Sequence, residues 1–201
     1  MHLAAIVLAA GRSQRFGAHN KLLQDLAGAP VIARTVAAVA EAHFHDIIVV
    51  TGQDHEAMEH ALRAYPVRFH RCAPELIGIG YSIAAGVGVL SDDSAGVAIL
   101  PGDMPLISAS TLRMVAEAFI IEVGERVVYA ADATGAQRNP VIWPRSYFAA
   151  LRDLTGDRGA KSLMRDAVAV TVRDDRELLD VDTPEVLEFA RATLVSRCTE
   201  C

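Results

Sequence analysis

The sequence predicts an α/β protein, with a three-layer α/β/α sandwich around a mainly parallel, Rossmann-like sheet. Short apolar runs alternate with helix-like segments along most of the 201 residues. Some of these runs, such as IIVV at 47–50 and VAIL at 97–100, lack polar alternation, as expected of strands covered on both faces. The composition agrees, because 52% of the residues are hydrophobic but only 5% are aromatic, and small side chains let helices pack closely on a sheet.

The predicted strands are short apolar runs bounded by glycine, proline or charge. They are Leu3–Ala9, Asp46–Thr51, Val67–His70, Gly96–Leu100, Val127–Ala131, Pro140–Trp143 and Val168–Val172. The predicted helices show helical apolar spacing or consist of good helix formers. They are Pro30–Ala42, Glu56–Ala64, Ser82–Leu90, Ser108–Glu122, Ser146–Leu154, Ala160–Arg165 and Pro184–Ser196. Thr183-Pro184 indicates a cap followed by a proline in the first turn.

The chain has no internal repeat, low-complexity tract or long linker. We therefore expect one domain over residues 1–196 and a flexible tail over 197–201. The formal net charge is −6 and the sequence contains no lysine or arginine block, so affinity for duplex nucleic acid lacks its usual electrostatic basis. No apolar run approaches the roughly 20 residues that cross a bilayer. We expect neither a nucleic-acid nor a membrane partner.

The three cysteines are Cys72, Cys198 and Cys201, an odd number in a chain whose apolar start has no basic leader. This pattern predicts a reduced, cytoplasmic protein. Cys198 and Cys201 form a lone C-x-x-C, which is interpreted as part of a solvated tail and not as a zinc site. The seven histidines are scattered and share no metal spacing with a carboxylate pair, so no histidine metal site is predicted.

The first predicted strand leads into a glycine-rich, cationic loop, VLAAGRSQRFG at 7–17. Gly11 and Gly17 let the backbone approach an anion and present N–H groups to it. Full positive charges come from Arg12, Arg15 and Lys21. The loop is either a cradle for a polyphosphate or an ordinary turn with solvated basic side chains. The absence of GxGxxG after this strand and of GxxxxGK[ST] disfavours a dinucleotide fold and a P-loop.

Two further segments carry candidate carboxylates. In ILPGDMPLI at 99–107, Asp103 follows a buried strand and suits a hard divalent cation such as Mg²⁺. Its alternative role is an Asx-type turn or a cap for the helix near Ser108. In LLDVDTPEVL at 178–187, Asp180 and Asp182 alternate in an extended segment, so only one is expected to face the site. Asp182 could instead cap the following helix.

Ligands in open α/β sheets bind beyond the carboxyl ends of the strands, so the three segments are expected to meet there. Nucleotidyl transfer would use all of them. A cationic loop binds the triphosphate, and a metal held by two carboxylates screens the negative oxygens, so that an anionic phosphate can attack the α-phosphorus.

Several motifs in one order also resemble a known family. They are LAAGRSQRFG followed by KLL, PGDMPL, NPVIWP at 139–144, LTGDRGAKSLM at 154–164 and LDVDTPE. Together they are similar to the MobA-like NTP transferases, and most similar to the MocA-type branch, the CTP:molybdopterin cytidylyltransferases. The resemblance covers nearly the whole chain and implies the Rossmann-like fold of the nucleotide-diphospho-sugar transferase type.

The resemblance also implies roles for single residues. Base and phosphate contacts fall on Leu8, Ala9, Ala10 and Gly11. Arg15 and Lys21 match the phosphate-binding pair, and Asp103 and Asp182 match the two aspartates that hold Mg²⁺. In GIGYSIAAG at 78–86, Gly80 and Ser82 match the G-x-S-x-x-x-G form of the cytidylyl branch, which favours CTP over GTP. Asn139 and Arg158 stand in the segments that face the acceptor.

The function implied by the resemblance is transfer of CMP from CTP to the terminal phosphate of molybdopterin, with release of pyrophosphate. A recipient molybdoenzyme or its chaperone would be a protein partner. The alternatives are guanylyl transfer from GTP, a sugar phosphate or other small phosphate as acceptor, and a non-catalytic protein that binds or delivers a nucleotide or pterin. The segment AHN before Lys21 is one residue longer than the family pattern, so the loop is expected to bulge if Lys21 is to reach the phosphates.

Overall fold

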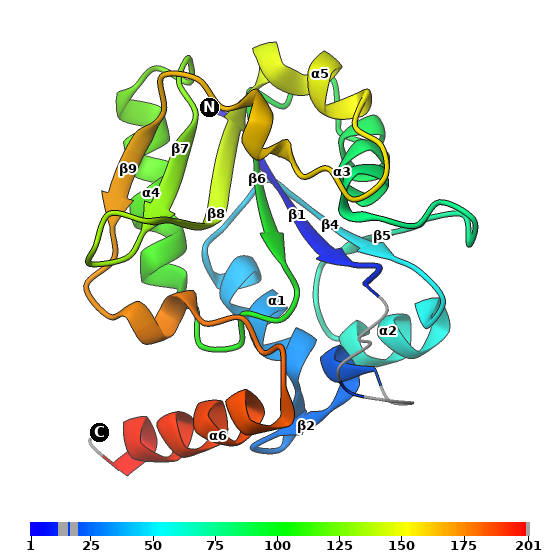
Figure 1. The fold of residues 1–201 in the computed structure, drawn as a ribbon, viewed down its shortest axis with the longest axis vertical. Coiled ribbons are helices and arrows are strands. Elements are labelled where there is room, and N and C mark those ends of the chain that lie inside the picture. The colour runs from blue at the N-terminus through cyan, green and yellow to red at the C-terminus, as the bar shows by residue number, and fades with distance from the viewer. Residues whose placement is uncertain (12–15, 17–19, 200–201) are drawn as a thin grey trace.

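The computed structural model describes residues 1–11, 16 and 20–199. A seven-stranded sheet forms its centre, in the order β5-β4-β1-β6-β8-β7-β9. The strands are β1 (Leu3–Ala9), β4 (Asp46–Thr51), β5 (Arg68–Arg71), β6 (Gly96–Pro101), β7 (Val128–Ala131), β8 (Gln137–Pro144) and β9 (Val168–Thr171). Strand β8 pairs antiparallel with β6 and β7, and the other pairings in this sheet are parallel (Figure 1). The mainly parallel sheet is confirmed.

Strand β1 shows why the fold has three layers, because its alternate side chains enter two different cores. Leu3, Ala5 and Val7 lie in one core, and Ala4 and Ile6 lie in the other. The first core is covered by α1 (Val31–Glu41), α2 (His55–Leu62), α4 (Ala109–Ile121) and α6 (Pro184–Thr199). The second is covered by α3 (Ile79–Gly88) and α5 (Phe148–Arg152). The predicted α/β/α sandwich is therefore confirmed.

Side-chain caps fix the starts of two helices that flank the candidate site. The hydroxyl of Ser108 accepts a hydrogen bond from the Thr111 N–H at 3.1 Å, which starts α4. The hydroxyl of Thr183 accepts one from the Val186 N–H at 3.4 Å, so the Thr-Pro signal for the start of α6 is confirmed. None of the described helices is both long enough and apolar enough to cross a membrane.

A small hairpin before α1 was not predicted from the sequence. Its strands are β2 (Asp25–Leu26) and β3 (Ala29–Pro30). The two turn residues, Ala27 and Gly28, have φ of 52° and 84°, as a two-residue turn with both φ positive requires. The guanidinium of Arg191 on α6 donates to the Asp25 carbonyl at 2.7 Å, which ties the hairpin to α6 (Figure 1). Strands of two residues carry no period, so the sequence gives no alternation signal.

Several element boundaries differ from those predicted, among them the start of β8, which lies at Gln137 and not at Pro140. Helix α3 begins at Ile79 and not at Ser82, so most of the 78–86 segment is helical and not a loop. Residues Ala160–Leu163 form a short 3₁₀ helix where a longer helix to Arg165 was predicted. Helix α6 continues to Thr199, three residues into the segment predicted as a tail, and residues 200–201 lie outside the described part.

Candidate active site

Backbone hydrogen bonds bring three distant segments together at the carboxyl end of the sheet. Strands β1 and β6 are neighbours, and Leu8 pairs with Pro101. Just beyond this pair, the Gly102 N–H donates to the Leu8 carbonyl at 2.9 Å. The Val181 N–H donates to the Asp103 carbonyl at 2.8 Å. The end of β1, the Asp103 loop and the Asp180–Asp182 segment therefore form one site, at the place where such sheets bind ligands.

Lys21 lies between two of the predicted carboxylates. It belongs to a short 3₁₀ helix, Lys21–Leu23, which Asn20 caps by accepting the Leu22 N–H at 3.0 Å. The Lys21 ammonium donates to Asp103 Oδ2 and, at 2.7 Å, to Asp182 Oδ1. The Asp103 side chain is 9% exposed, whereas that of Asp182 is 49% exposed. Lys21 thus reaches the site despite the longer loop before it.

The ionisation of Lys21 follows from this position. Burial on its own lowers the pKa of Lys21, but the charges and hydrogen bonds of Asp103 and Asp182 outweigh it and leave the pKa raised. The side chain therefore carries a full positive charge at neutral pH. That charge faces two carboxylates which would otherwise repel each other.

Asp180 is a third carboxylate of the same group, against the expectation that only one of Asp180 and Asp182 faces the site. Burial, together with the charges of Asp103 and Asp182, raises the pKa of Asp180 to about 6, against the opposing charges of Lys21 and Arg138. The segment is extended but belongs to no described sheet, so strict alternation of faces does not apply to it. Asp103, Asp180 and Asp182 are called the acidic cluster below.

The acidic cluster has the donor atoms that a hard divalent cation requires. Asp103 Oδ1 and Asp180 Oδ1 are buried and have no hydrogen-bond partner among the described residues. Buried polar atoms are normally satisfied, so two orphaned carboxylate oxygens in one place indicate a missing ligand. Divalent cations such as Mg²⁺ take oxygen ligands, often one or two carboxylates together with substrate phosphates and waters. The residues present therefore fit such an ion.

The strand-to-loop turn after β1 is packed tightly on one side and open on the other. A side chain at Gly52 would meet the Ala10 carbonyl at 3.1 Å, so the backbones of the β1 and β4 ends lie close together. At Gly11, by contrast, no atom of the described residues lies within 4 Å of the place where a Cβ would stand, and the residue is exposed. Arg15, like Arg12 and Gly17, lies outside the described residues. Ala9 is buried, and Leu8 and Ala10 are partly exposed.

The start of α3 and the 154–159 loop, both predicted to face substrates, pack directly on each other. The Gly80 N–H donates to the Gly156 carbonyl at 2.9 Å. A Cβ at Gly78, which has φ of 126°, would lie 2.2 Å from that same carbonyl oxygen, and one at Gly80 would lie 2.8 Å from the Arg158 carbonyl. Glycine is therefore required at both positions. This backbone contact explains why a glycine-rich segment starts a helix.

Ser82 has a supporting place within this unit. Its side chain is buried, and its hydroxyl donates to the Gly78 carbonyl at 3.4 Å. It also hydrogen-bonds the buried thiol of Cys72, whose pKa is nevertheless raised by burial. Direct contact of Ser82 with a nucleotide base stays a prediction. Arg158 is exposed on the 154–159 loop, and its contact with an acceptor also stays a prediction.

Asn139 lies on β8, two residues before Val141, which pairs with Ile99 on β6, and a register shift interrupts the pairing with β7 between Val141 and Arg138. Contact of Asn139 with an acceptor stays a prediction. Its neighbour Arg138, which sequence reasoning missed, donates to Asp132 at 2.9 Å and contributes positive charge near Asp180. The signal that could have found Arg138 was its place directly before the NPVIWP motif.

Asp132 is a second residue that was missed. Its carboxylate accepts hydrogen bonds from the Thr134 hydroxyl and from the backbone N–H groups of Thr134 and Ala136, and it pairs with Arg138. The hydrogen bond from Thr134, together with those from Arg138 and the backbone, lowers the pKa of Asp132 to about 2 against the opposing effect of burial. Asp132 therefore fixes both the 132–136 turn and the direction of Arg138.

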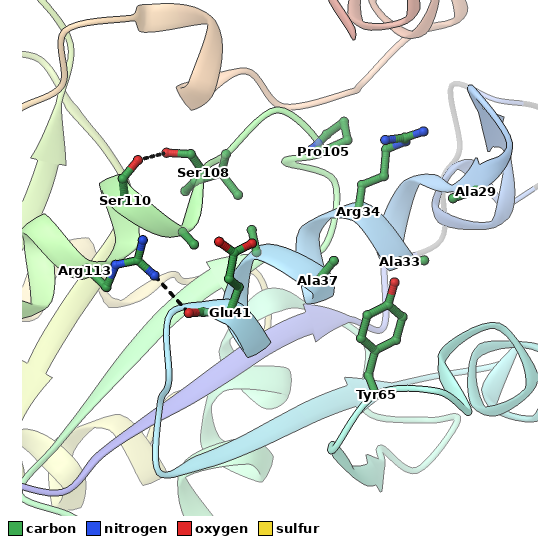
Figure 2. A pocket seen from close by; sticks show the side chains of 13 residues that line it. Ala29, Ala33, Arg34, Ala37, Glu41, Tyr65, Pro105, Ser108, Ser110 and Arg113 are labelled. Atoms are coloured by element: carbon green, nitrogen blue, oxygen red, sulfur yellow. Dashed lines mark hydrogen bonds between the residues drawn. The ribbon is translucent and has the colours of Figure 1, made fainter. Parts of the chain in front are cut away.

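A groove between α1 and α4, with a volume of about 410 Å³, is separate from these residues. Figure 2 shows small side chains of α1, such as Ala33 and Ala37, among the residues that line it, together with two hydrogen bonds. Arg113 donates to the Glu41 carbonyl at 2.9 Å, and the hydroxyls of Ser108 and Ser110 lie 2.8 Å apart. It contains none of the predicted site residues. The acidic cluster, and not this groove, is therefore the candidate active site.

Comparison with known proteins agrees with this geometry. Residues 5–173 match the model of the MobA-like NTP transferase domain. Over 206 residues, the chain is 25% identical to the purine catabolism protein PucB of Bacillus subtilis, covering 96% of this chain and 98% of PucB. It is 38% identical over 137 residues to the bifunctional protein GlmU of Geobacter sulfurreducens, covering 67% of this chain but 26% of GlmU.

Solved structures share the fold over nearly the whole chain. A nucleotidyl transferase from Methanothermobacter superposes with a TM-score of 0.82 at 24% identity, covering 98% of this chain and 99% of that one. Rv0371c of Mycobacterium tuberculosis superposes with a TM-score of 0.81 at 24% identity, covering 96% and 98%, and that protein is also known in complex with manganese. With the family match over residues 5–173, the conclusion is that this chain is a nucleotidyltransferase and belongs to the MobA-like NTP transferase family.

Proposed function

We propose that this protein transfers CMP from CTP to the terminal phosphate of molybdopterin, in a Mg²⁺-dependent reaction that releases pyrophosphate. The observation that carries the reaction class is the acidic cluster with Lys21, which lies next to the open backbone after β1. CTP is supported by the LAAG and G-x-S-x-x-x-G segments, and the acceptor by the NPVIWP and LTGDRGAKSLM segments. These resemble the cytidylyl branch of the family.

The reaction joins two anions. An oxygen of the acceptor phosphate attacks the α-phosphorus of CTP, and the bond from that phosphorus to the oxygen bridging to the β-phosphate breaks, with pyrophosphate as the leaving group. Asp103 and Asp182 would hold Mg²⁺, with Asp180 close behind them, and the bound ion would supply neutralising charge for the phosphates. Phosphoryl chemistry of this kind depends mainly on positioning and electrostatics, so the protein's task is to fix charges.

Lys21 has two tasks in this proposal. In the nucleotide-free protein its ammonium neutralises Asp103 and Asp182 and keeps their oxygens converging on one point. It therefore competes with a divalent cation for the same oxygens. When the triphosphate is bound, the same protonated amine is close enough to the site to donate to phosphate oxygens, together with Arg15. Exposed backbone at Gly11 and the adjoining Leu8, Ala9 and Ala10 would receive the base and phosphates.

Residues 1–196 act as one catalytic domain in this proposal, and the enzyme works in the cytoplasm. The unit made by the start of α3 and the 154–159 loop fixes Gly80, Ser82 and Arg158 relative to one another, which supports a shared role in substrate selection. Asn139 would face the acceptor from β8. The product, a pterin dinucleotide, would pass to a molybdoenzyme or to its chaperone.

The test is pyrophosphate release by the purified protein with Mg²⁺ and molybdopterin, with CTP and GTP in parallel reactions. Release with CTP and not with GTP is the expected result. Release with GTP alone would retain the enzyme class and overturn the base assignment. Release only with a sugar phosphate or another small phosphate would overturn the acceptor. Tight nucleotide binding without turnover on any acceptor would point to a binding or delivery protein.

A further inference from the structure

Two histidines and an aspartate meet at the opposite end of the sheet from the acidic cluster. His2 directly precedes β1, His45 directly precedes β4, and Asp93 stands three residues before β6. These are adjacent parallel strands, in the order β4-β1-β6. The sheet fixes the backbone here, because the His45 N–H donates to the Leu3 carbonyl at 2.8 Å and the Ala95 N–H donates to the His2 carbonyl at 2.9 Å. The three residues are called the His–Asp cluster.

One carboxylate oxygen of the His–Asp cluster faces nitrogens of both rings. His2 Nδ1 lies 2.8 Å from Asp93 Oδ2, and His45 Nε2 lies 3.7 Å from the same oxygen. One ligand atom from each of the three side chains lies within 4.8 Å of the other two. The side chains are about half exposed, at 54%, 49% and 50% for His2, His45 and Asp93. The cluster is therefore both converged and open to solvent.

We propose that His2, His45 and Asp93 form a second cation site, one that takes Zn²⁺ and clips together the starts of β1, β4 and β6. Two imidazole nitrogens and one carboxylate oxygen are ligands that Zn²⁺ accepts, with water completing the shell. Mg²⁺ prefers an all-oxygen shell, so it is the weaker fit here and the better fit at the acidic cluster. The two ends of the sheet thus differ in the ions that they select.

The two imidazole rings must change orientation before both can bind one ion. The His2 and His45 rings are stacked, with centroids 4.1 Å apart and 8° between their planes. Ring-nitrogen lone pairs lie in the ring plane, so two parallel rings must tilt before both can point at one ion. The side chains are half exposed, and exposed side chains change rotamer rapidly. A rotation of the side chains, with no change in the sheet, is sufficient to form the site.

Binding at the His–Asp cluster should stabilise the folded chain. The ligands come from three segments separated by tens of residues, so the unfolded chain has no preformed site, and metal binding then adds to folding stability. Because the cluster lies at the amino ends of the strands, this effect does not require the acidic cluster. Stability in Zn²⁺ and pyrophosphate release are therefore separate readouts.

The test is calorimetric titration of Zn²⁺ alone into the whole chain, at neutral pH and in an excess of Mg²⁺ that occupies the acidic cluster. His2→Asn, His45→Asn and Asp93→Asn each remove one ligand while keeping a polar side chain. Loss of an outer-shell partner alone typically weakens metal binding by about 10–100-fold, so each variant should bind Zn²⁺ at least about tenfold more weakly. His60→Asn, at an exposed histidine on α2, is the matched control and should bind as the wild type does.

Thermal unfolding gives a second readout. Zn²⁺ should raise the Tm of the wild type and of His60→Asn, and it should raise that of His45→Asn much less. Equal Zn²⁺ affinity in His2→Asn, His45→Asn and the wild type would overturn the proposal, and so would absence of saturable binding to the wild type. Asp103→Asn separates the two ends: if it abolishes Zn²⁺ binding while His45→Asn retains it, the ion occupies the acidic cluster and the proposal is wrong.

Discussion

The two ends of the central sheet carry aspartates in opposite electrostatic situations. At the carboxyl end, burial and the charges of Asp103 and Asp182 together raise the pKa of Asp180 to about 6. At the amino end, hydrogen bonds from Ser91 and His2 lower the pKa of Asp93, which is exposed. The same side chain is thus disfavoured as an anion at one end and favoured at the other.

This difference shows where the fold tolerates unfavourable electrostatics. Buried carboxylates that repel one another destabilise the protein unless a cation is present, and in this structure Lys21 supplies that cation. Exposed groups such as the His–Asp cluster impose little cost. Such unfavourable arrangements concentrate at functional sites, so the carboxyl end is the end at which chemistry is expected.

The largest expected effect comes from removing a carboxylate of the acidic cluster, at the carboxyl end of the sheet. Asp103→Asn removes one buried negative charge with little change in shape, and turnover should fall by at least about a hundredfold, because charge stabilisation at the phosphates is lost. Pyrophosphate release under saturating substrates measures it. Asp153→Asn, at an exposed aspartate after α5, is the control and should retain wild-type turnover. Wild-type turnover by Asp103→Asn would remove Asp103 from the mechanism.

Replacing Lys21 should separate its two proposed roles, which are neutralising Asp103 and Asp182 and binding the phosphates. Lys21→Met keeps the length of the side chain but removes its charge, so turnover should fall by about tenfold or more, because donors to developing charge are lost. Without nucleotide, the same variant should bind Mn²⁺ or Mg²⁺ more tightly than the wild type, since the competing ammonium is gone. Calorimetry without nucleotide tests the second effect. Weaker divalent binding in Lys21→Met would show that the lysine assists the metal and does not compete with it.

The backbone contact between the start of α3 and the 154–159 loop can be disrupted by a substitution that changes no charge. Gly78→Ala would force a Cβ to 2.2 Å from the Gly156 carbonyl at a φ of 126°, which should destabilise the protein by about 1–3 kcal/mol and raise KM for the nucleotide. Gly88→Ala lies in the same helix, where an added Cβ would meet no atom of the described residues within 4 Å, and it should be neutral or stabilising. Urea unfolding and initial rates compare the two. Equal stability of both variants would contradict the packing described here.

The smallest expected effect concerns Asp174, an aspartate beyond the carboxyl end of β9 that forms ion pairs with Arg176 and Arg197. Side-chain hydrogen bonds from Arg176 and Arg197, together with the backbone hydrogen bond and the charge of Arg176, lower the pKa of Asp174 to about 2 despite the opposing effect of burial. Its unfolded pKa is near 3.8, so the unfolded chain binds the proton more readily, and the stabilisation is present above about pH 4 and lost as the pH falls towards 2.

Asp174→Asn should therefore lower the free energy of unfolding by about 1 kcal/mol at pH 7, allowing for partial solvent screening. The difference from the wild type should shrink between pH 4 and pH 2. Urea titrations at several pH values measure it. An Asp174→Asn effect that is unchanged at pH 2 would mean that the loss comes from packing and not from ionisation.

The sequence was sufficient to predict the main architecture, because the buried strands are apolar on both faces and are bounded by glycine, proline or charge. Asp103 was also predicted from its place after a strand end, and the roles of Lys21 and Asp182 were predicted from the resemblance of their motifs to the family. Their mutual contact depends on the sheet order, which local pattern does not contain. The start of α3 was misplaced because glycine has a low helix propensity, whereas close backbone packing on the 154–159 loop required it.

Two groups could not be predicted for the same reason. The rule of alternation predicted that only one of Asp180 and Asp182 faces the site, but this rule holds within sheets and not in the unpaired segment where both residues lie. His2, His45 and Asp93 appeared scattered because ligand spacing along a sequence detects only local sites. Parallel strands bring residues from distant segments to one edge, and their proximity follows from the register of β1 with β4 and β6.

The separation of the site residues along the chain has a consequence for synthesis. Lys21 is 82 residues from Asp103 and 161 residues from Asp182, and the bond from Val181 to the Asp103 carbonyl joins the last motif to the middle one. Contacts of such high sequence separation form late, after loop closure has been overcome. A ribosome that has released only the first half of this chain therefore holds strands without a complete acidic cluster, which can assemble only once residue 182 has emerged and docked.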